Sequence, residues 1–386
     1  MDSTLFSITE ENIKVQRPTK VLEQNAAKIA VVGVGGGGCN MINHMISEGI
    51  NKIDLIVANT DLQVLNLSKA PKKLQLGTEL TRGLGAGMKP EIGRDAAIES
   101  YQEIVDSLDG ADIVFIAAGL GGGTGTGAAP VVAQIAKDVG ALTISVVTKP
   151  FMFEGKKRQK LAEAGLEELK RESDSIVVIP NDKLLSIIDR KLGLKDSFKI
   201  VDSVLAQAVS GTSGVILSSG SNDINLDFAD LKTVMNHKGM ALMGVGEHEG
   251  DNAAYEAIKS AIESPLLDNM SINGAMGVLV HFSMHPDFPT MEIYSAMEVV
   301  NESAHEDADI IFGTSTDENI AQDYVKITIV ATGFENQDEK STGTNNEDFV
   351  NDNPAPIAKS RPRLVVGGDM DESHLEVPSY MRRQQD

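Results

Sequence analysis

Two glycine-rich segments, each directly after a predicted buried strand, most constrain the fold of this chain. The first, residues 33–40, reads Gly-Val-Gly-Gly-Gly-Gly-Cys-Asn, and the second, residues 119–127, has six glycines in nine residues. Glycine lets backbone N–H groups approach a polyphosphate without interference from a Cβ atom, and the positive end of a following helix favours the same anion. The pair therefore predicts a nucleotide site at one edge of a sheet.

The first segment also fits Gly-x-Gly-x-x-Gly, the fingerprint of dinucleotide-binding domains, through Gly33, Gly35 and Gly38. Alone, this motif leaves a nicotinamide-dependent oxidoreductase open. The second segment favours a nucleoside triphosphate, because a nicotinamide-binding domain needs only one phosphate-binding turn. The sequence lacks Gly-x-x-x-x-Gly-Lys-Ser/Thr. Backbone amides and the hydroxyls of Thr124 and Thr126 would then hold the phosphates.

Composition narrows the class of protein further. The 386 residues suffice for two domains and a tail. The sequence contains neither a membrane-length apolar run nor a secretory leader, which predicts a cytoplasmic protein without direct membrane insertion. The single cysteine, Cys39, excludes an internal disulfide, and its position favours a small residue in a tight turn over redox control. A formal net charge of −22 argues against nucleic acid as a partner.

Hydrophobic patterning predicts an α/β fold with a doubly wound parallel sheet, a long central helix and a smaller second α/β domain. Apolar, β-branched runs predict parallel strands at residues 28–32, 53–58, 73–76, 111–118, 141–147 and 175–179. Apolar residues at helical spacing predict the long helix at 197–217. The second domain has predicted strands near 241–245, 277–282, 309–312 and 324–331, and helices at 253–263 and 291–301. Ligands of such sheets bind at the carboxyl ends of the strands.

The same pass predicts six regions along the chain. They are a flexible extension (1–27), a nucleotide-binding domain (28–196), the central helix (197–217), a second α/β domain (218–334), a disordered linker (335–374) and a docking peptide (375–386). The linker is polar and has too few apolar residues to offset the entropy of ordering. The last segment regains apolar and basic character, which fits either a docking peptide or a frayed terminus.

Polar residues near the predicted nucleotide edge carry further hypotheses. Glu154 and Arg158 are four apart, so one helix would present both toward that edge, although a surface ion pair fits equally well. The Asp202 carboxylate could accept the ring N–H and the exocyclic amine of guanine, but a solvated acid on a helix surface is the simpler interpretation. A third glycine segment, residues 83–87, follows a short strand toward the same edge.

Asp227 and Asp230 are three apart at the start of a predicted helix. They either cap that helix or polarise a water molecule. Both follow the long helix, which places them about 30 Å from the glycine segments at a rise of about 1.5 Å per residue. At that distance they could not act on a nucleotide bound to their own subunit.

Taken together, these segments resemble the FtsZ family, the bacterial tubulin homologues of cell division. The resemblance spans about residues 28–333 and the last dozen, and it is carried by residues 35–40, 59–61, 83–87, 121–127, 149–158 and 225–230. It implies a tubulin/FtsZ-like fold and a GTPase that polymerises head to tail into protofilaments and builds the cytokinetic ring at mid-cell. A scaffold that polymerises without hydrolysis stays open as an alternative.

The resemblance also implies a set of site residues, with GTP or GDP as the ligand, Mg²⁺ near the phosphates and the metal ligands unknown. The residues implied to bind GTP are Gly36, Gly37, Gly38, Cys39, Asn40, Asn59, Ala86, Gly87, Gly122, Gly123, Thr124, Gly125, Thr126, Glu154, Arg158, Asn181, Phe198 and Asp202. Asn225, Asp227 and Asp230 would complete the neighbouring subunit's site by positioning the attacking water. The final segment would bind membrane-tethering and regulatory division proteins. Departures from the family pattern occur at Cys39, at Met88-Lys89 and at 218–223.

Overall fold

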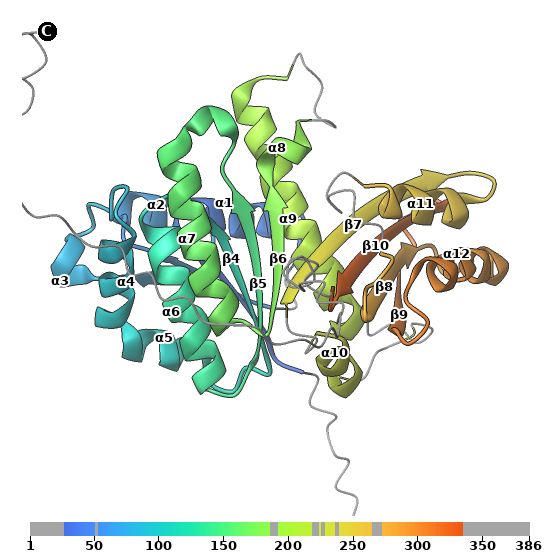
Figure 1. The fold of residues 1–386 in the computed structure, drawn as a ribbon, viewed down its shortest axis with the longest axis horizontal. Coiled ribbons are helices and arrows are strands. Elements are labelled where there is room, and N and C mark those ends of the chain that lie inside the picture. The colour runs from blue at the N-terminus through green and yellow to red at the C-terminus, as the bar shows by residue number, and fades with distance from the viewer. Residues whose placement is uncertain are drawn as a thin grey trace, which may run out of the picture. The chain divides into compact units, whose positions relative to one another are not determined.

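Six parallel strands form the first part of the sheet in the computed structural model (Figure 1), which describes residues 27–50, 53–185, 192–217, 224, 228–235, 239–264 and 272–334. The strands are β1 (Ile29–Val34), β2 (Asp54–Asn59), β3 (Lys72–Gln75), β4 (Ile113–Gly119), β5 (Leu142–Lys149) and β6 (Ser175–Pro180). Their order is β3-β2-β1-β4-β5-β6, and every neighbouring pair is parallel. The central strands are buried over almost their whole length, which explains why their sequences are continuous apolar runs.

Helices cover both faces of this sheet, as the doubly wound prediction requires. Apolar side chains of α1 (Gly35–Ser47), α2 (Leu62–Leu67) and α9 (Leu194–Leu217) pack on one face. The other face is covered by α4 (Pro90–Glu99), α5 (Tyr101–Leu108), α6 (Thr124–Asp138) and α7 (Lys156–Glu172). The short elements α3 (Thr78–Thr81), η1 (Met152–Glu154) and α8 (Asn181–Leu184) lie in the connections.

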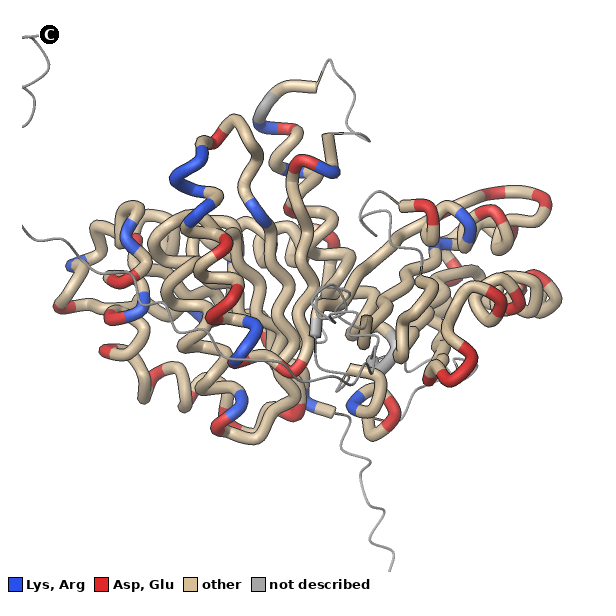
Figure 2. The backbone as a smooth tube through the Cα atoms, in the orientation of Figure 1, with Lys and Arg blue, Asp and Glu red and all other residues tan. Residues whose placement is uncertain are grey.

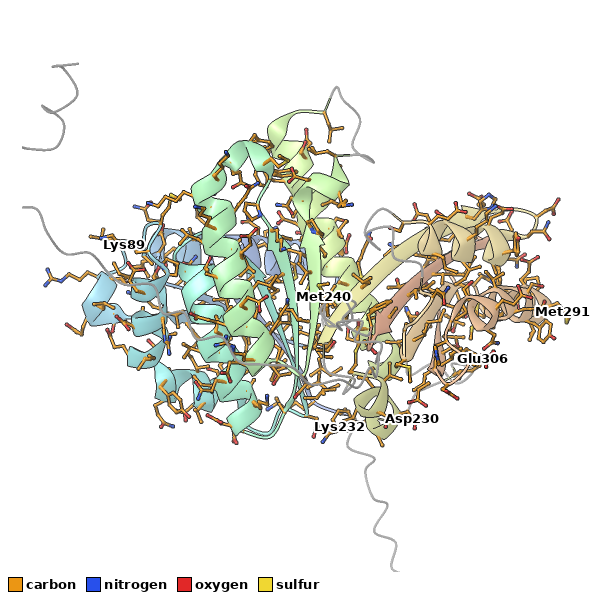
Figure 3. All side chains as sticks on the ribbon, viewed as in Figure 1. Lys89, Asp230, Lys232, Met240, Met291 and Glu306 are labelled. Carbon is orange, nitrogen blue, oxygen red and sulfur yellow. The ribbon has the colours of Figure 1, made fainter. Side chains whose placement is uncertain are left out.

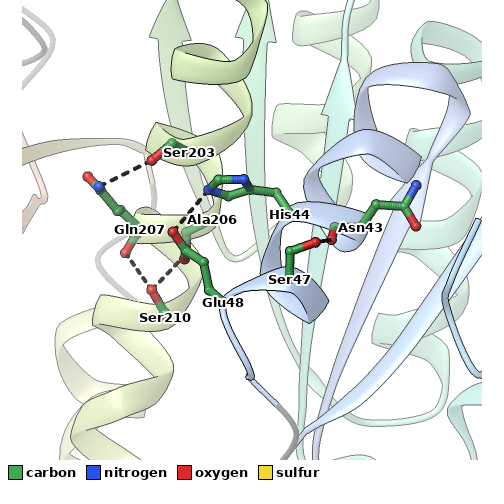
Figure 4. Close-up of polar contacts among 8 residues, drawn as sticks. All are labelled: Asn43, His44, Ser47, Glu48, Ser203, Ala206, Gln207 and Ser210. Carbon is green, nitrogen blue, oxygen red and sulfur yellow. Dashed lines mark hydrogen bonds and ion pairs between the residues drawn. The ribbon is translucent and has the colours of Figure 1, made fainter. Parts of the chain in front are cut away.

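The long helix α9 begins three residues earlier than predicted and packs against α1 and β5. Figure 4 shows the polar contacts near the α1–α9 interface, and none of them joins the two helices. His44 Nε2 lies 3.1 Å from Glu48 Oε1 at the end of α1, and Gln207 Nε2 donates to Ser203 Oγ at 3.4 Å within α9. Apolar side chains therefore hold the two helices together. No helix in the described ranges is long and apolar enough to cross a bilayer.

The second part of the chain extends the same sheet. Its elements are α10 (Phe228–Met235), β7 (Gly239–Glu249), α11 (Ala253–Ile262), β8 (Gly277–Met284), α12 (Thr290–Ser303), β9 (Asp309–Thr316) and β10 (Tyr324–Thr332). Strand β7 pairs in parallel with β6 through only three residue pairs, Ser175↔Gly239 to Val177↔Ala241. The result is one ten-stranded order, β3-β2-β1-β4-β5-β6-β7-β10-β8-β9.

Strand β7 is much longer than the predicted 241–245. Its polar second half, with Glu247, His248 and Glu249, stays in the sheet because it pairs antiparallel with β10. Outside the described residues lie most of the predicted extension (1–26), the linker and docking peptide (335–386), and the polar segment 218–223. Asn225 and Asp227 also lie outside them.

The glycine segments, predicted as loops, are largely the first turns of helices. Gly35–Gly38 open α1, and Thr124–Gly127 open α6. A Cβ atom on Gly38 would collide with the carbonyl oxygen of Ala117 in β4, and one on Gly35 would lie 2.8 Å from the amide nitrogen of Gly125. Glycine is needed here because the two helix starts contact each other and the strand beneath them.

The contact between α6 and α4 gives a stability test. A Cβ atom on Gly127 would overlap the carbonyl oxygen of Pro90, which is backbone and cannot rotate away. We expect Gly127→Ala to lower the free energy of unfolding by about 1–3 kcal/mol, as overpacking typically does. Urea denaturation of the nucleotide-free protein measures this change.

The matched control is Gly122→Ala in the same segment, because a Cβ atom there meets nothing within 4 Å. Its free energy of unfolding should stay close to that of the unaltered chain. Equal losses in the two variants would contradict the packing argument.

Candidate nucleotide-binding site

A cavity of about 330 Å³ lies at the carboxyl ends of β1, β4 and β5, between the first turns of α1 and α6 and the first half of α9. Most of the residues predicted to bind GTP line it: Gly36, Gly37, Asn40, Gly87, Gly122, Gly123, Thr124, Gly125, Glu154, Arg158, Asn181, Phe198 and Asp202. Residues that are far apart in the sequence thus share one wall, as the winding of the sheet predicts.

Backbone amides and open space characterise one end of the cavity. A Cβ atom on Gly36, Gly87 or Gly122 would meet no atom within 4 Å, so a side chain there would project into unfilled space. The first turns of α1 and α6 contain no acidic residue. The positive ends of two helix dipoles therefore point at this space, and no carboxylate in those first turns offsets them. This arrangement favours a bound anion.

Two threonine hydroxyls have different roles at this end. The Oγ1 atoms of Thr124 and Thr60 are 2.7 Å apart and share a hydrogen bond. Thr126 is almost fully buried, and its Oγ1 accepts from the Gly121 amide at 2.8 Å. Gly121 has a φ of +99°, so this bond holds a turn that only glycine adopts readily. Thr126 thus shapes the turn behind the cavity and is absent from its lining.

The opposite end of the cavity is formed by α9 and by Asn181, the first residue of α8 directly after β6. Phe198, Val201, Asp202 and Leu205 follow one another at helical spacing and all line the cavity. Burial raises the pKa of Asp202 to about 7. Asp202 is half-buried, whereas Asn181 is buried and its Oδ1 has no hydrogen-bond partner among the described residues. These two groups offer acceptor oxygens to a ligand with N–H donors.

Aromatic rings and an ion pair close one side. Phe151 meets Phe198 edge to face, with ring centroids 5.5 Å apart, and stacks on Phe153 at 4.9 Å. Arg158 Nη1 donates to Glu154 Oε2 at 2.6 Å, and Glu154 Oε1 accepts from the Phe151 amide at 3.0 Å. Glu154 lies in η1 and Arg158 in α7, so this ion pair connects the two elements, whereas the sequence predicted both residues on one helix.

Five predicted residues, Gly38, Cys39, Asn59, Ala86 and Thr126, lie outside the cavity lining. The cause for Cys39 is that its side chain is fully buried on α1, where its Sγ accepts from Asn59 Nδ2 at 3.7 Å. Burial also raises the pKa of the Cys39 thiol to about 11. A buried, protonated thiol is a poor redox switch, which agrees with the interpretation of Cys39 as a small residue in a tight turn.

Comparison with known proteins now places the chain. Residues 28–189 match the model of the Tubulin/FtsZ family, GTPase domain, and residues 239–335 match that of the FtsZ family, C-terminal domain. Over 365 residues, or 93% of each chain, the sequence is 47% identical to the cell division protein FtsZ of Helicobacter pylori. The chain belongs to the FtsZ family.

A solved structure of FtsZ agrees with this assignment, and a more distant solved structure shares the fold. An empty FtsZ dimer from M. jannaschii has a TM-score of 0.77 and 47% identity, covering 81% of this chain and 90% of that one. CetZ2 from Haloferax volcanii, as a GTPgS-bound protofilament, has a TM-score of 0.67 at 21% identity, covering 81% and 96%. The second likeness shows a shared fold.

Sequence reasoning missed part of the cavity wall in this FtsZ-family chain. The residues it missed are Gly119, Leu120, Thr148, Pro150, Val201 and Leu205. Val201 and Leu205 follow Phe198 at helical spacing, and that pattern is the signal that could have found them. Thr148 and Pro150 lie at the end of β5, the third strand to end at this edge.

Asp230 lies apart from this FtsZ-family cavity. It is exposed on α10 (Figure 3), and it lines a second cavity of about 440 Å³ with Thr233 and residues 309–312 of β9. The described residues contain no cluster of three or more His, Cys, Asp or Glu side chains that suits a metal ion. One chain thus contributes a nucleotide cavity and, on a different element, an exposed acid.

Proposed function

We propose that this protein hydrolyses GTP to GDP and phosphate in head-to-tail filaments that form the cytokinetic ring at mid-cell, in the cytoplasm. Membership of the FtsZ family, with its GTPase domain, supports the activity. The observation that carries the proposal is the cavity itself, which has two glycine helix starts at one end and buried acceptors at the other. The dimeric and filamentous forms of related proteins support self-association.

In this proposal, the phosphates lie against the first turns of α1 and α6. The amides of Gly36, Gly37 and Gly123–Gly125 would donate to phosphate oxygens, and Thr124 would add its hydroxyl. The unfilled space beside Gly36, Gly87 and Gly122 supports this placement, because a side chain at these positions would fill the room that the phosphates need.

The guanine base would lie at the α9 end. Asp202 would accept the ring N–H and the exocyclic amine, and the unpartnered Asn181 Oδ1 supports a further donor from the ligand. Phe198 would pack against the base, held in place by its contact with Phe151. Glu154 and Arg158 would face the ribose. Adenine presents no such pair of donors to a carboxylate, so this end would select guanine.

Mg²⁺ fits the site as a partner of the phosphates. Such ions are often held by one or two carboxylates, water and phosphate oxygens, which agrees with the lack of an acidic cluster among the described residues. The ion would neutralise phosphate charge when bound. The chain's own residues would bind the nucleotide, exclude water around the base and orient the phosphates.

Hydrolysis would take place between subunits. Residues of the first half of α9 line the cavity, whereas Asp230 follows the end of this 24-residue helix, which is about 36 Å long at about 1.5 Å per residue. Asp230 of one subunit would therefore serve the nucleotide of the next, together with Asn225 and Asp227. The predicted nucleotide-binding domain (28–196) and second domain (218–334) would each contribute half of every active site.

Mixing two defective variants tests the intersubunit site. Asp230→Ala keeps the cavity and should bind GTP, but we expect it to lose turnover by roughly 10²- to 10⁴-fold. Gly122→Trp keeps Asp230 and should not bind GTP, because the indole fills the cavity. Random head-to-tail assembly of an equimolar mixture gives about one quarter of interfaces with both intact halves, so phosphate release should recover.

Four results would count against this scheme. Normal turnover by Asp230→Ala alone would remove the role of that acid. A mixture as inactive as its components would argue against shared sites. Constant specific activity of the unaltered protein at every concentration would mean that one subunit suffices, and GTP-dependent assembly without phosphate release would indicate a non-hydrolysing scaffold.

The raised pKa of Asp202 predicts a pH dependence of GTP binding. Only the ionised carboxylate can accept both guanine donors, and at its pKa of about 7 half of the free protein carries a proton there. Affinity for GTP should therefore be constant well above pH 7 and weaken by up to about tenfold per pH unit below it. Fluorescence titration with a labelled GTP between pH 5.5 and 8.5 measures this.

Asp202→Asn provides the control for this experiment. It should bind GTP weakly at every pH, since an amide accepts through one oxygen and presents donors of its own. A variant that kept the same pH dependence would show that another group titrates.

We propose that residues 375–386 bind membrane-tethering and regulatory division proteins. The support is their mixed apolar and basic sequence after a long polar linker. Removing these residues should leave GTP turnover and assembly unchanged while abolishing recruitment to vesicles that carry a tethering protein. Sedimentation with and without such vesicles distinguishes these effects, and loss of assembly itself would contradict a purely docking role.

A further inference from the structure

Strand β7 has a long edge that pairs with no other strand in the described part of the chain. On one side it pairs with β10 from Leu242 to Glu249. On the other side it pairs with β6 only at 239–241, after which the two strands separate. Leu242, Met243 and Gly244 are buried, whereas residues 245–249 present backbone N–H and C=O groups that lack a strand partner on that side. Figure 1 shows β7 running on from β6 toward α11.

A cavity of about 550 Å³ lies against this edge. It is lined by Val204, Gln207, Val245, Gly246, Glu247, Glu256, Lys259, Ser260, Glu263 and Ser264, which come from α9, β7 and the end of α11. A Cβ atom on Gly246 would collide with the carbonyl oxygen of Ala257. Helix α11 thus packs tightly on one face of β7, while the edge itself opens into the cavity.

The chemistry of the lining favours one kind of occupant. Val204 and Val245 offer apolar surface beside the edge. The cavity is also lined by three carboxylates, those of Glu247, Glu256 and Glu263, but by only one ammonium group, that of Lys259. Figure 2 shows that acidic residues also predominate along the neighbouring α12 and its connections. A basic segment would meet a complementary field here, whereas an acidic one would be repelled.

We propose that the free edge of β7 is a docking site for an extended segment of a partner protein in which basic and apolar residues alternate. The segment adds to the sheet as a further strand, so its backbone pairs with residues 245–249. Apolar side chains face Val204 and Val245, and basic ones face the carboxylates of α11. Strand addition of this kind combines main-chain hydrogen bonds with side-chain specificity. The proposal does not depend on GTP hydrolysis.

A synthetic heptapeptide, Lys-Val-Lys-Val-Lys-Val-Lys with a fluorescent label, is the probe. Fluorescence anisotropy with the full chain in the presence of GDP measures its binding, and the Glu-Val counterpart should not bind. Two further versions carry N-methyl groups on either the valine or the lysine amides. Amides of alternate residues point to opposite sides of a strand, so one version should lose binding and the other should keep it.

Protein variants locate the site. Glu256→Lys with Glu263→Lys should weaken binding roughly tenfold, whereas Glu298→Lys with Glu302→Lys on α12, the matched change of charge, should not. Ser260→Trp should block the cavity without altering charge. Hydrogen exchange of the amides in 245–249 should slow when the peptide binds. All variants should retain GTP turnover, which shows that they are folded.

The proposal fails under several outcomes. These are no binding by the unaltered chain, equal binding of both N-methylated peptides, equal losses in the α11 and α12 variants, or binding that leaves exchange in 245–249 unchanged. The third outcome would indicate attraction to the net negative charge alone, and the fourth would indicate docking through side chains elsewhere.

Discussion

The close approach of two helix N-termini at the ends of β1 and β4 is the constraint on which the rest of the structure depends. Helices α1 and α6 can begin side by side only because Gly35, Gly38 and Gly125 leave no Cβ atoms between backbones that almost touch. This approach directs two rows of amides into one space, at the end of the cavity opposite α9. Larger residues at these positions would separate the helices from the sheet, and the cavity would lose its anion-binding end.

Local pattern predicted much of the fold, since buried parallel strands have an unmistakable apolar composition. The strands of the first part were located within two residues at either end. The errors have physical causes. Glycine runs indicate loops by propensity, but tertiary packing makes Gly35–Gly38 helical. The end of β7 is polar because its side chains are exposed to solvent, so pairing with β10 rather than burial defines its length.

The candidate site also contains some residues that the sequence could predict and others that it missed. Glycine, threonine and the acid Asp202 could be proposed from sequence, because their chemistry differs from that of core residues. Leu120, Val201 and Leu205 were missed, because an apolar side chain that lines a cavity has the same sequence pattern as one that packs in a core. The shift in the pKa of Asp202 also required the structure, since it arises from burial by segments distant in sequence.

The three residue pairs between β6 and β7 have a mechanical consequence. Each part of the sheet is broad and cross-linked by many hydrogen bonds, whereas the seam between them is a narrow ladder backed by α9. So few backbone hydrogen bonds resist sliding of β7 along β6, but they do little to prevent the two parts of the sheet from twisting relative to each other. In subunits joined end to end, twisting strain would therefore concentrate at this seam. The flexibility of a filament would then depend on the interior of each subunit as much as on the interfaces between subunits.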